Sequence, residues 1–75
     1  MIIEAGGKYY TTTQHADERM LEKDITADQI KQVIEQGEVV LTVRGDDFYR
    51  LKISNREIGV IIGNDERIVT VFIIE

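Results

Sequence analysis

The chain has 75 residues, of which 43% are apolar and 31% charged, and it contains no proline and no cysteine. This length fits one small domain, and the composition excludes a disordered tail and a disulfide scaffold. Fourteen acidic against nine basic side chains give a formal net charge of -5, which opposes indiscriminate nucleic-acid binding because that binding requires cations on the phosphates. No apolar run approaches the roughly 18 residues of a membrane-spanning helix, and no signal peptide is visible, so we expect a cytoplasmic protein without membrane contact.

The first predicted elements are two extended pieces and a helix. Residues 1–4 and 8–12 are rich in β-branched residues and tyrosine and flank a Gly-Gly pair, which indicates two short strands around a turn. Residues 13–23 lack glycine and proline and are mostly good helix formers, so they predict the first helix. Asp24 is expected to end it, because aspartate tolerates the left-handed conformation that often closes a helix.

The second helix carries the clearest signal at its start. Thr26 and Gln29 have the spacing of a capping box, in which each side chain bonds to the backbone of the other residue. Ile25 and Ile30 flank this box as a hydrophobic staple. Gly37 supplies the stop at the other end.

After Gly37 the pattern changes to short β-rich runs. These runs cover residues 39–43, 48–53, 58–62 and 68–74, with short turns between them. Consecutive strands joined by short turns predict an antiparallel meander. The predicted fold is therefore α+β: two helices on one face of a meander of about four strands, with an N-terminal strand or hairpin.

Pairing arithmetic predicts what each face of this sheet holds. Loops at residues 45–47, 54–57 and 64–67 place Ile53 opposite Ile58 and maximise apolar burial under the helices. The predicted core face then comprises Val39, Leu41, Val43, Tyr49, Leu51, Ile53, Ile58, Val60, Ile62, Val69, Val71 and Ile73.

The opposite face is predicted to be mixed in character. One cross-strand row holds Thr42, Arg50, Ile61 and Thr70, and the next row holds Lys52, Gly59 and Phe72, with Gly63 and Ile68 beyond. Two cations on one strand with glycines leaving open space beside them suit an anion or a docked partner. The run at residues 68–74 is apolar on both faces, which predicts a central strand that a dimer or another partner covers on its second side.

Two segments of the chain resemble a known family. The run TQHADERM at residues 13–20 and the run IVTVF at residues 68–72 are similar to the opening and closing motifs of the domain-of-unknown-function 4258 family. This chain departs from that pattern in its acidity and at Lys23-Asp24, where arginine and glycine would be usual. The family is similar in layout to the RelE and BrnT class of small bacterial toxins, which cleave RNA and are neutralised by a cognate antitoxin.

The resemblance implies a set of site residues. His15, Arg19 and Arg50 would be catalytic: His15 would transfer a proton, and the two arginines would hold the scissile phosphate. Lys52 and Thr70 would bind substrate. Such cleavage needs no metal and no cofactor, and one histidine without cysteines does not build a closed metal shell.

Each of these residues also has a structural interpretation. His15 can bond locally at the helix start, Arg19 can pair with Glu22, and Arg50 and Lys52 can form a solvated face with cross-strand partners. Two functions therefore remain open. One is a metal-independent ribonuclease toxin with RNA as substrate and an antitoxin as partner; the other is a non-catalytic module that forms a homodimer. The dimer contact would use Phe48, Ile61 and Phe72.

Overall fold

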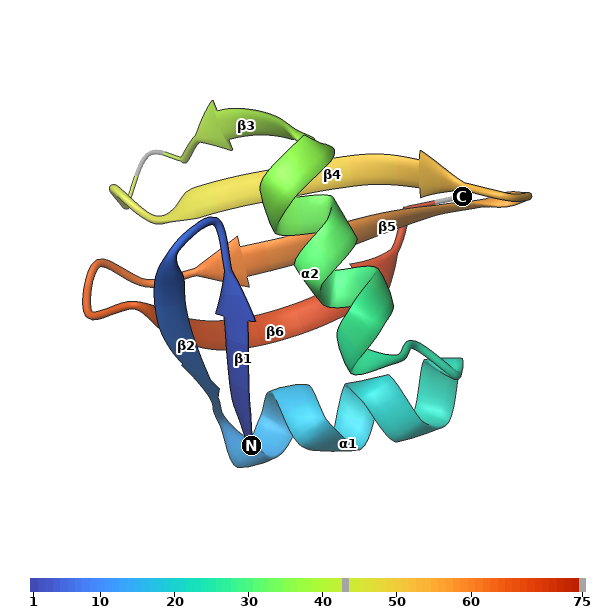
Figure 1. The fold of residues 1–75 in the computed structure, drawn as a ribbon, viewed down its shortest axis with the longest axis horizontal. Coiled ribbons are helices and arrows are strands. Elements are labelled where there is room, and N and C mark those ends of the chain that lie inside the picture. Colours follow the sequence, from blue (N-terminus) through green and yellow to red (C-terminus); the bar gives the residue numbers. More distant parts are fainter. Residues whose placement is uncertain (43, 75) are drawn as a thin grey trace.

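The computed structural model describes residues 1–42 and 44–74, without the side chain of Leu41. Two helices lie against a curled sheet that is built mostly from the C-terminal half of the chain (Figure 1). In chain order the elements are β1 (Ile2–Ala5), β2 (Lys8–Thr12), α1 (Gln14–Lys23), α2 (Ala27–Gln36), β3 (Glu38–Leu41), β4 (Asp47–Ile53), β5 (Arg56–Ile62) and β6 (Arg67–Ile73).

The described strands form one sheet in the order β1-β2-β6-β5-β4-β3. All neighbours are antiparallel except β2 and β6, which run parallel where Thr11 and Thr12 pair with Arg67 and Ile68. The predicted α+β class, the N-terminal hairpin and the central position of β6 are confirmed. The sheet is larger than the predicted meander, because the hairpin joins it through β6.

The core lies between the helices and one face of the sheet. Helix α1 packs against β6 and β2, and α2 crosses β4, β5 and β1. The apolar stripe of each helix is buried, as its periodicity predicts. Tyr10, which the pairing arithmetic leaves outside the core, is buried, whereas its neighbour Tyr9 is exposed. The buried apolar side chains of this core are Ile3, Ala5, Tyr10, Ala16, Met20, Ile25, Ile30, Val33, Ile34, Ile58, Val60, Ile62, Ile68 and Val71.

The predicted helix ends are confirmed. Asp24 closes α1 in the left-handed conformation, with φ 55°, and Thr26 and Gln29 form both bonds of the capping box. Gly37 ends α2, and its φ of -78° is a conformation that any residue can adopt. The requirement for glycine here is therefore steric. A Cβ there would lie 2.3 Å from the Val33 carbonyl oxygen and 2.6 Å from that of Arg50, so the close approach of two backbones requires glycine.

The predicted four-residue loop between β4 and β5 is wrong. The strands turn at Ser54 and Asn55, and Ile53 pairs with Arg56 instead of Ile58. Ser54 has φ 58°, a conformation that permits the tight two-residue turn. Because this register differs from the predicted one by an even number of residues, the side chains of β4 and β5 keep their predicted faces.

Two further core predictions are corrected. A β-bulge between β5 and β6 sets Ile62 opposite Ile68, which buries Ile68 and exposes Val69, the reverse of the prediction. Val39 is 51% exposed because it lies on an outer strand of the sheet. The predicted core positions Leu41 and Val43 lie outside the described side chains.

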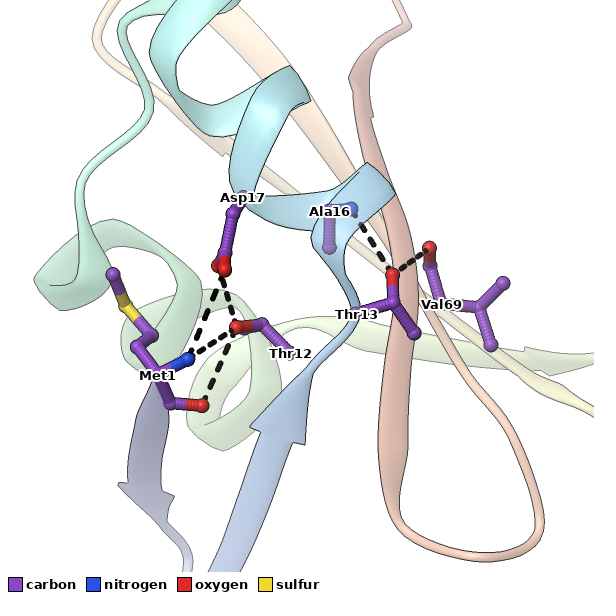
Figure 2. A network of polar contacts seen from close by, with 6 residues as sticks. All are labelled: Met1, Thr12, Thr13, Ala16, Asp17 and Val69. Carbon is purple, nitrogen blue, oxygen red and sulfur yellow. Dashed lines mark hydrogen bonds and ion pairs between the residues drawn. The ribbon is translucent and has the colours of Figure 1, made fainter.

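The junction between β1, β2 and α1 is held by polar contacts (Figure 2). The Met1 amine donates to Thr12 Oγ1 at 2.8 Å and lies 3.8 Å from the Asp17 carboxylate, to which the Thr12 hydroxyl donates. At the same junction Thr13 Oγ1 accepts from the Ala16 amide at 3.0 Å and donates to the Val69 carbonyl at 2.9 Å. One hydroxyl therefore caps α1 and attaches it to β6.

No helix within the described residues has the length and apolarity to cross a membrane.

Candidate functional site

Three of the predicted site residues share the face of the sheet that the helices leave uncovered, which we call the helix-free face. The observed register aligns Phe48, Ile61 and Thr70 in one row of this face. The adjacent row contains Glu38, Arg50, Gly59 and Phe72, and Lys52 follows opposite Glu57. Arg50, Lys52 and Thr70 thus lie on one surface. The predicted row partners of Arg50 are corrected. The two-residue turn between β4 and β5 sets Gly59 opposite Arg50 in place of Ile61, and the earlier start of β3 with its longer loop to β4 sets Glu38 there in place of Thr42.

The surface beside Arg50 is covered by aromatic rings. Phe48 and Phe72 stack with their centroids 5.6 Å apart and an interplanar angle of 27°. A Cβ on Gly59 would lie 2.8 Å from the Phe72 ring and 3.0 Å from the Phe48 ring, so this glycine makes room for the stacked pair. The prediction of open space at Gly59 is wrong. The space above Gly59 is filled by the Phe48 and Phe72 rings.

The charge of Arg50 is balanced by two glutamates. Its Nε donates to Glu38 Oε1 at 3.1 Å, Nη2 lies at the same distance from that oxygen, and Glu57 lies 3.9 Å away. Lys52 is directly opposite Glu57 in the register. A guanidinium that already has carboxylate partners must give them up before it can hold a phosphate. The helix-free face therefore carries a balanced set of charges.

A depression of about 360 Å³ lies at one end of the helix-free face. Its base is apolar, with Ile61 and Val69, and Thr70 is the one predicted site residue that lines it. Thr42 Oγ1 accepts from the backbone amides of Arg44 and Asp46, which shapes the loop at its rim. Sequence reasoning placed Thr42, Ile61 and Thr70 in one row of this face but did not include Arg44, Asp46 and Val69, because their positions depend on the bulge and on the loop length. The lining residues are Thr42, Arg44, Asp46, Ile61, Val69 and Thr70.

The other two predicted site residues lie one turn apart on α1. His15 is exposed. The Arg19 Nη1 atom lies 3.3 Å from Glu22, whereas its Nε is buried without a hydrogen-bond partner among the described residues. No hydrogen bond or ion pair within residues 1–42 and 44–74 joins either side chain to Arg50 or Thr70. The structure thus divides the predicted site between a helix and a sheet face.

Comparison with known proteins gives one match. The family described as a domain of unknown function, DUF4258, covers residues 12–73. The chain belongs to the DUF4258 family. No curated protein and no solved structure shows a significant match.

Most of the opening DUF4258 motif has a structural role in this chain. Thr13 caps α1 and bonds to β6, while Ala16 and Met20 are buried in the core. His15 and Arg19 are motif positions that this packing does not explain. They are the residues of the DUF4258 motif on which a functional hypothesis can rest.

Proposed function

We propose that this DUF4258 chain is a non-catalytic binding module that dimerises through its helix-free face. The observation that supports this most is the stacked pair Phe48–Phe72, with Ile61 alongside, on a face that no helix covers. Large apolar side chains that remain partly exposed and are bordered by polar groups are typical of interaction surfaces. Domains of this size also gain stability from association, because one small core supplies only a few kcal/mol.

The charges on this face favour a second copy of the chain as the partner. A twofold contact brings a surface against itself, so like charges would oppose the approach of two molecules with a net charge of -5. On the helix-free face, Arg50 and Lys52 are matched by Glu38 and Glu57. Two copies can therefore pair each cation with a carboxylate. A nucleic-acid surface would instead have an excess of cations.

The test is the molar mass of the protein in solution. We expect the wild type to be dimeric in light scattering, and Phe72→Asp to be monomeric because a carboxylate would be buried in the contact. The matched control is Leu21→Asp on α1, where the side chain is 86% exposed, and this variant should remain dimeric. Circular dichroism checks that both variants fold. A monomeric wild type, or an unchanged mass for a folded Phe72→Asp variant, would exclude this interface.

A metal-independent ribonuclease of the RelE/BrnT type is the second candidate. The observation that favours this function is the pair His15 and Arg19, whose imidazole and guanidinium lie one turn apart on α1. Packing in the core explains neighbouring motif residues such as Ala16 and Met20, but it does not explain these two. Imidazole can transfer the proton of a ribose 2'-hydroxyl, and a guanidinium can hold the phosphate. In this proposal Arg50, Lys52 and Thr70 would contact RNA, and a cognate antitoxin would cover the site.

Incubation with labelled single-stranded RNA in EDTA separates the two functions. The enzyme hypothesis expects fragments that end in a 2',3'-cyclic phosphate with wild type, and none with His15→Ala or Arg50→Ala. Lys23→Ala, which removes another cation of α1, is the matched control and should cleave like wild type. Equal cleavage by all four proteins indicates a contaminating nuclease. The absence of cleavage by wild type removes the support for autonomous catalysis.

A further inference from the structure

The depression at the end of the helix-free face is lined by two charged side chains of opposite sign. Arg44 and Asp46 reach it from the loop between β3 and β4. The ion pairs within residues 1–42 and 44–74 all join other residues. In that part of the chain, Arg44 and Asp46 form hydrogen bonds only through backbone groups, including the amides that donate to Thr42 Oγ1. A cation and an anion are therefore both open to a ligand here.

The two threonines of the depression differ in the hydrogen bonds that they can still form. A hydroxyl group offers one donor and two acceptor sites. Thr42 Oγ1 accepts from the amides of Arg44 at 3.3 Å and Asp46 at 3.2 Å, which uses both acceptor sites and leaves the donor. Thr70 donates to the Val71 carbonyl at 3.5 Å, which leaves its acceptor sites. The depression thus combines one hydroxyl that can donate to a ligand with one that can accept from it.

The base of the depression is apolar because of the β-bulge. Ile61 pairs with Thr70 and Ile62 pairs with Ile68, so Val69 is the extra residue of β6. Successive residues of a regular strand point to opposite faces, whereas a bulge can direct two of them to the same face. Val69 and Thr70 accordingly both line the depression, and Val69 is exposed. An aliphatic group of a ligand can therefore cover Ile61 and Val69.

We propose that the depression binds a free α-amino acid with an aliphatic side chain. Arg44 and the Thr42 hydroxyl donate to its carboxylate. Asp46 and Thr70 accept from its ammonium group, and its side chain covers the apolar base. The volume of about 360 Å³ is at the lower end of the roughly 300–1,000 Å³ typical of ligand sites, which suits a molecule of this size. An anion without a cationic group is disfavoured, because it would meet the Asp46 carboxylate.

The test is a titration of the isotope-labelled wild-type protein with L-leucine, followed by NMR. We expect saturable shifts at the backbone amides of the lining residues, Val69 and Thr70 among them. Three matched ligands each lack one recognised part: isocaproate lacks the ammonium group, isoamylamine lacks the carboxylate, and glycine lacks the aliphatic side chain. Each should bind at least tenfold more weakly than leucine. The proposal fails if millimolar leucine causes no shifts at these amides, or if any of the three binds as tightly as leucine.

Two protein variants locate the contact. Arg44→Gln and Asp46→Asn each remove one charge and keep the backbone amides that bond to Thr42, and each should lower the affinity for leucine at least tenfold. Arg67→Gln is the matched control, because this exposed arginine of β6 does not line the depression, and it should bind like wild type. Phe72→Asp should also bind normally, since Phe72 is not a lining residue, so this proposal and the dimer are tested independently. Wild-type affinity in either Arg44→Gln or Asp46→Asn would overturn the proposal.

Discussion

Asp24 holds a backbone conformation that favours glycine. Its φ of 55° crowds the Cβ of any L-residue, whereas glycine has no Cβ to crowd. We expect Asp24→Gly to raise the free energy of unfolding by about 0.5 to 1 kcal/mol. Asp28→Gly, within α2, should instead lower it by about 0.5 to 1 kcal/mol, because glycine is unfavourable in a helix. Urea unfolding followed by circular dichroism measures both, and a loss of stability in Asp24→Gly would contradict this account.

Tyr10 makes stability dependent on alkaline pH. Burial of its side chain disfavours the phenolate and raises the pKa of Tyr10 above its ordinary value near 10. The neutral form is thus the one that the fold accommodates. Stability from this group is fully present below the ordinary pKa and is lost as the pH rises through the raised value.

We therefore expect Tyr10→Phe to lose less stability than wild type between pH 8 and pH 11, since phenylalanine cannot ionise. Urea unfolding at the two pH values measures this difference. Tyr9→Phe is the matched control, because Tyr9 is exposed, and it should follow the wild type. The same alkaline loss in Tyr10→Phe as in wild type would show that another group controls the transition.

At the scale of elements, Arg56 connects β5 to the end of α1. Its guanidinium donates to the carbonyl oxygens of Lys23 and Asp24 and, at 3.2 Å, to Gln29 Oε1. The last carbonyls of a helix have no partners within the helix and carry partial negative charge, so a cation there is favourable. One side chain thereby holds the turn between the two helices against the sheet.

We expect Arg56→Met to lower the free energy of unfolding by about 1 to 2 kcal/mol, because carbonyl groups lose charged donors while the apolar stem is kept. Arg67→Met is the control: Arg67 is exposed and pairs only with Asp65 among the described residues, so its loss should cost at most about 0.5 kcal/mol. Thermal unfolding compares the two variants. Equal effects would mean that Arg56 acts only as a surface charge.

Local patterns predicted the helices better than the pairing of strands. The capping box at Thr26 and the end of α1 at Asp24 depend on neighbouring residues, and both are present. A turn at Ser54 was predicted, but its two-residue length was not, because serine with a positive φ has no clear sequence signature. The bulge was missed because Ile68 and Val69 are equally apolar, and alternation alone does not decide which of them faces the core.

The candidate site was also predicted only in part, because its face depends on local alternation whereas its contacts depend on strand pairing. The face that carries Arg50, Lys52 and Thr70 follows from alternation along two strands, so it could be read from sequence. The pairing of Arg50 with Glu38 and the ring cover over Gly59 depend on register between strands, which a single sequence does not fix. Alternation along a strand determines which face of the sheet a side chain occupies, and the register between strands determines which side chains lie next to it on that face.

At the scale of the whole molecule, the proposed dimerisation would link stability to protein concentration. If the helix-free faces associate only when folded, mass action raises the apparent melting temperature as protein concentration increases. We expect this increase for wild type and for Leu21→Asp, and a constant, lower value for Phe72→Asp. Scanning calorimetry over a hundredfold range of concentration measures it. A concentration-independent wild type would show that the face contributes nothing to stability.

The parallel pairing of β2 with β6 joins segments from nearly opposite ends of the chain. Translation proceeds from the N-terminus, so β2 and α1 are made long before the strand to which Thr12 and Thr13 bond. The hairpin and first helix must wait in a partly solvated state until β6 has left the ribosome, because loop closure across such a separation is slow. Pairing of β2 with β6 is therefore expected to be a late step in the folding of this domain.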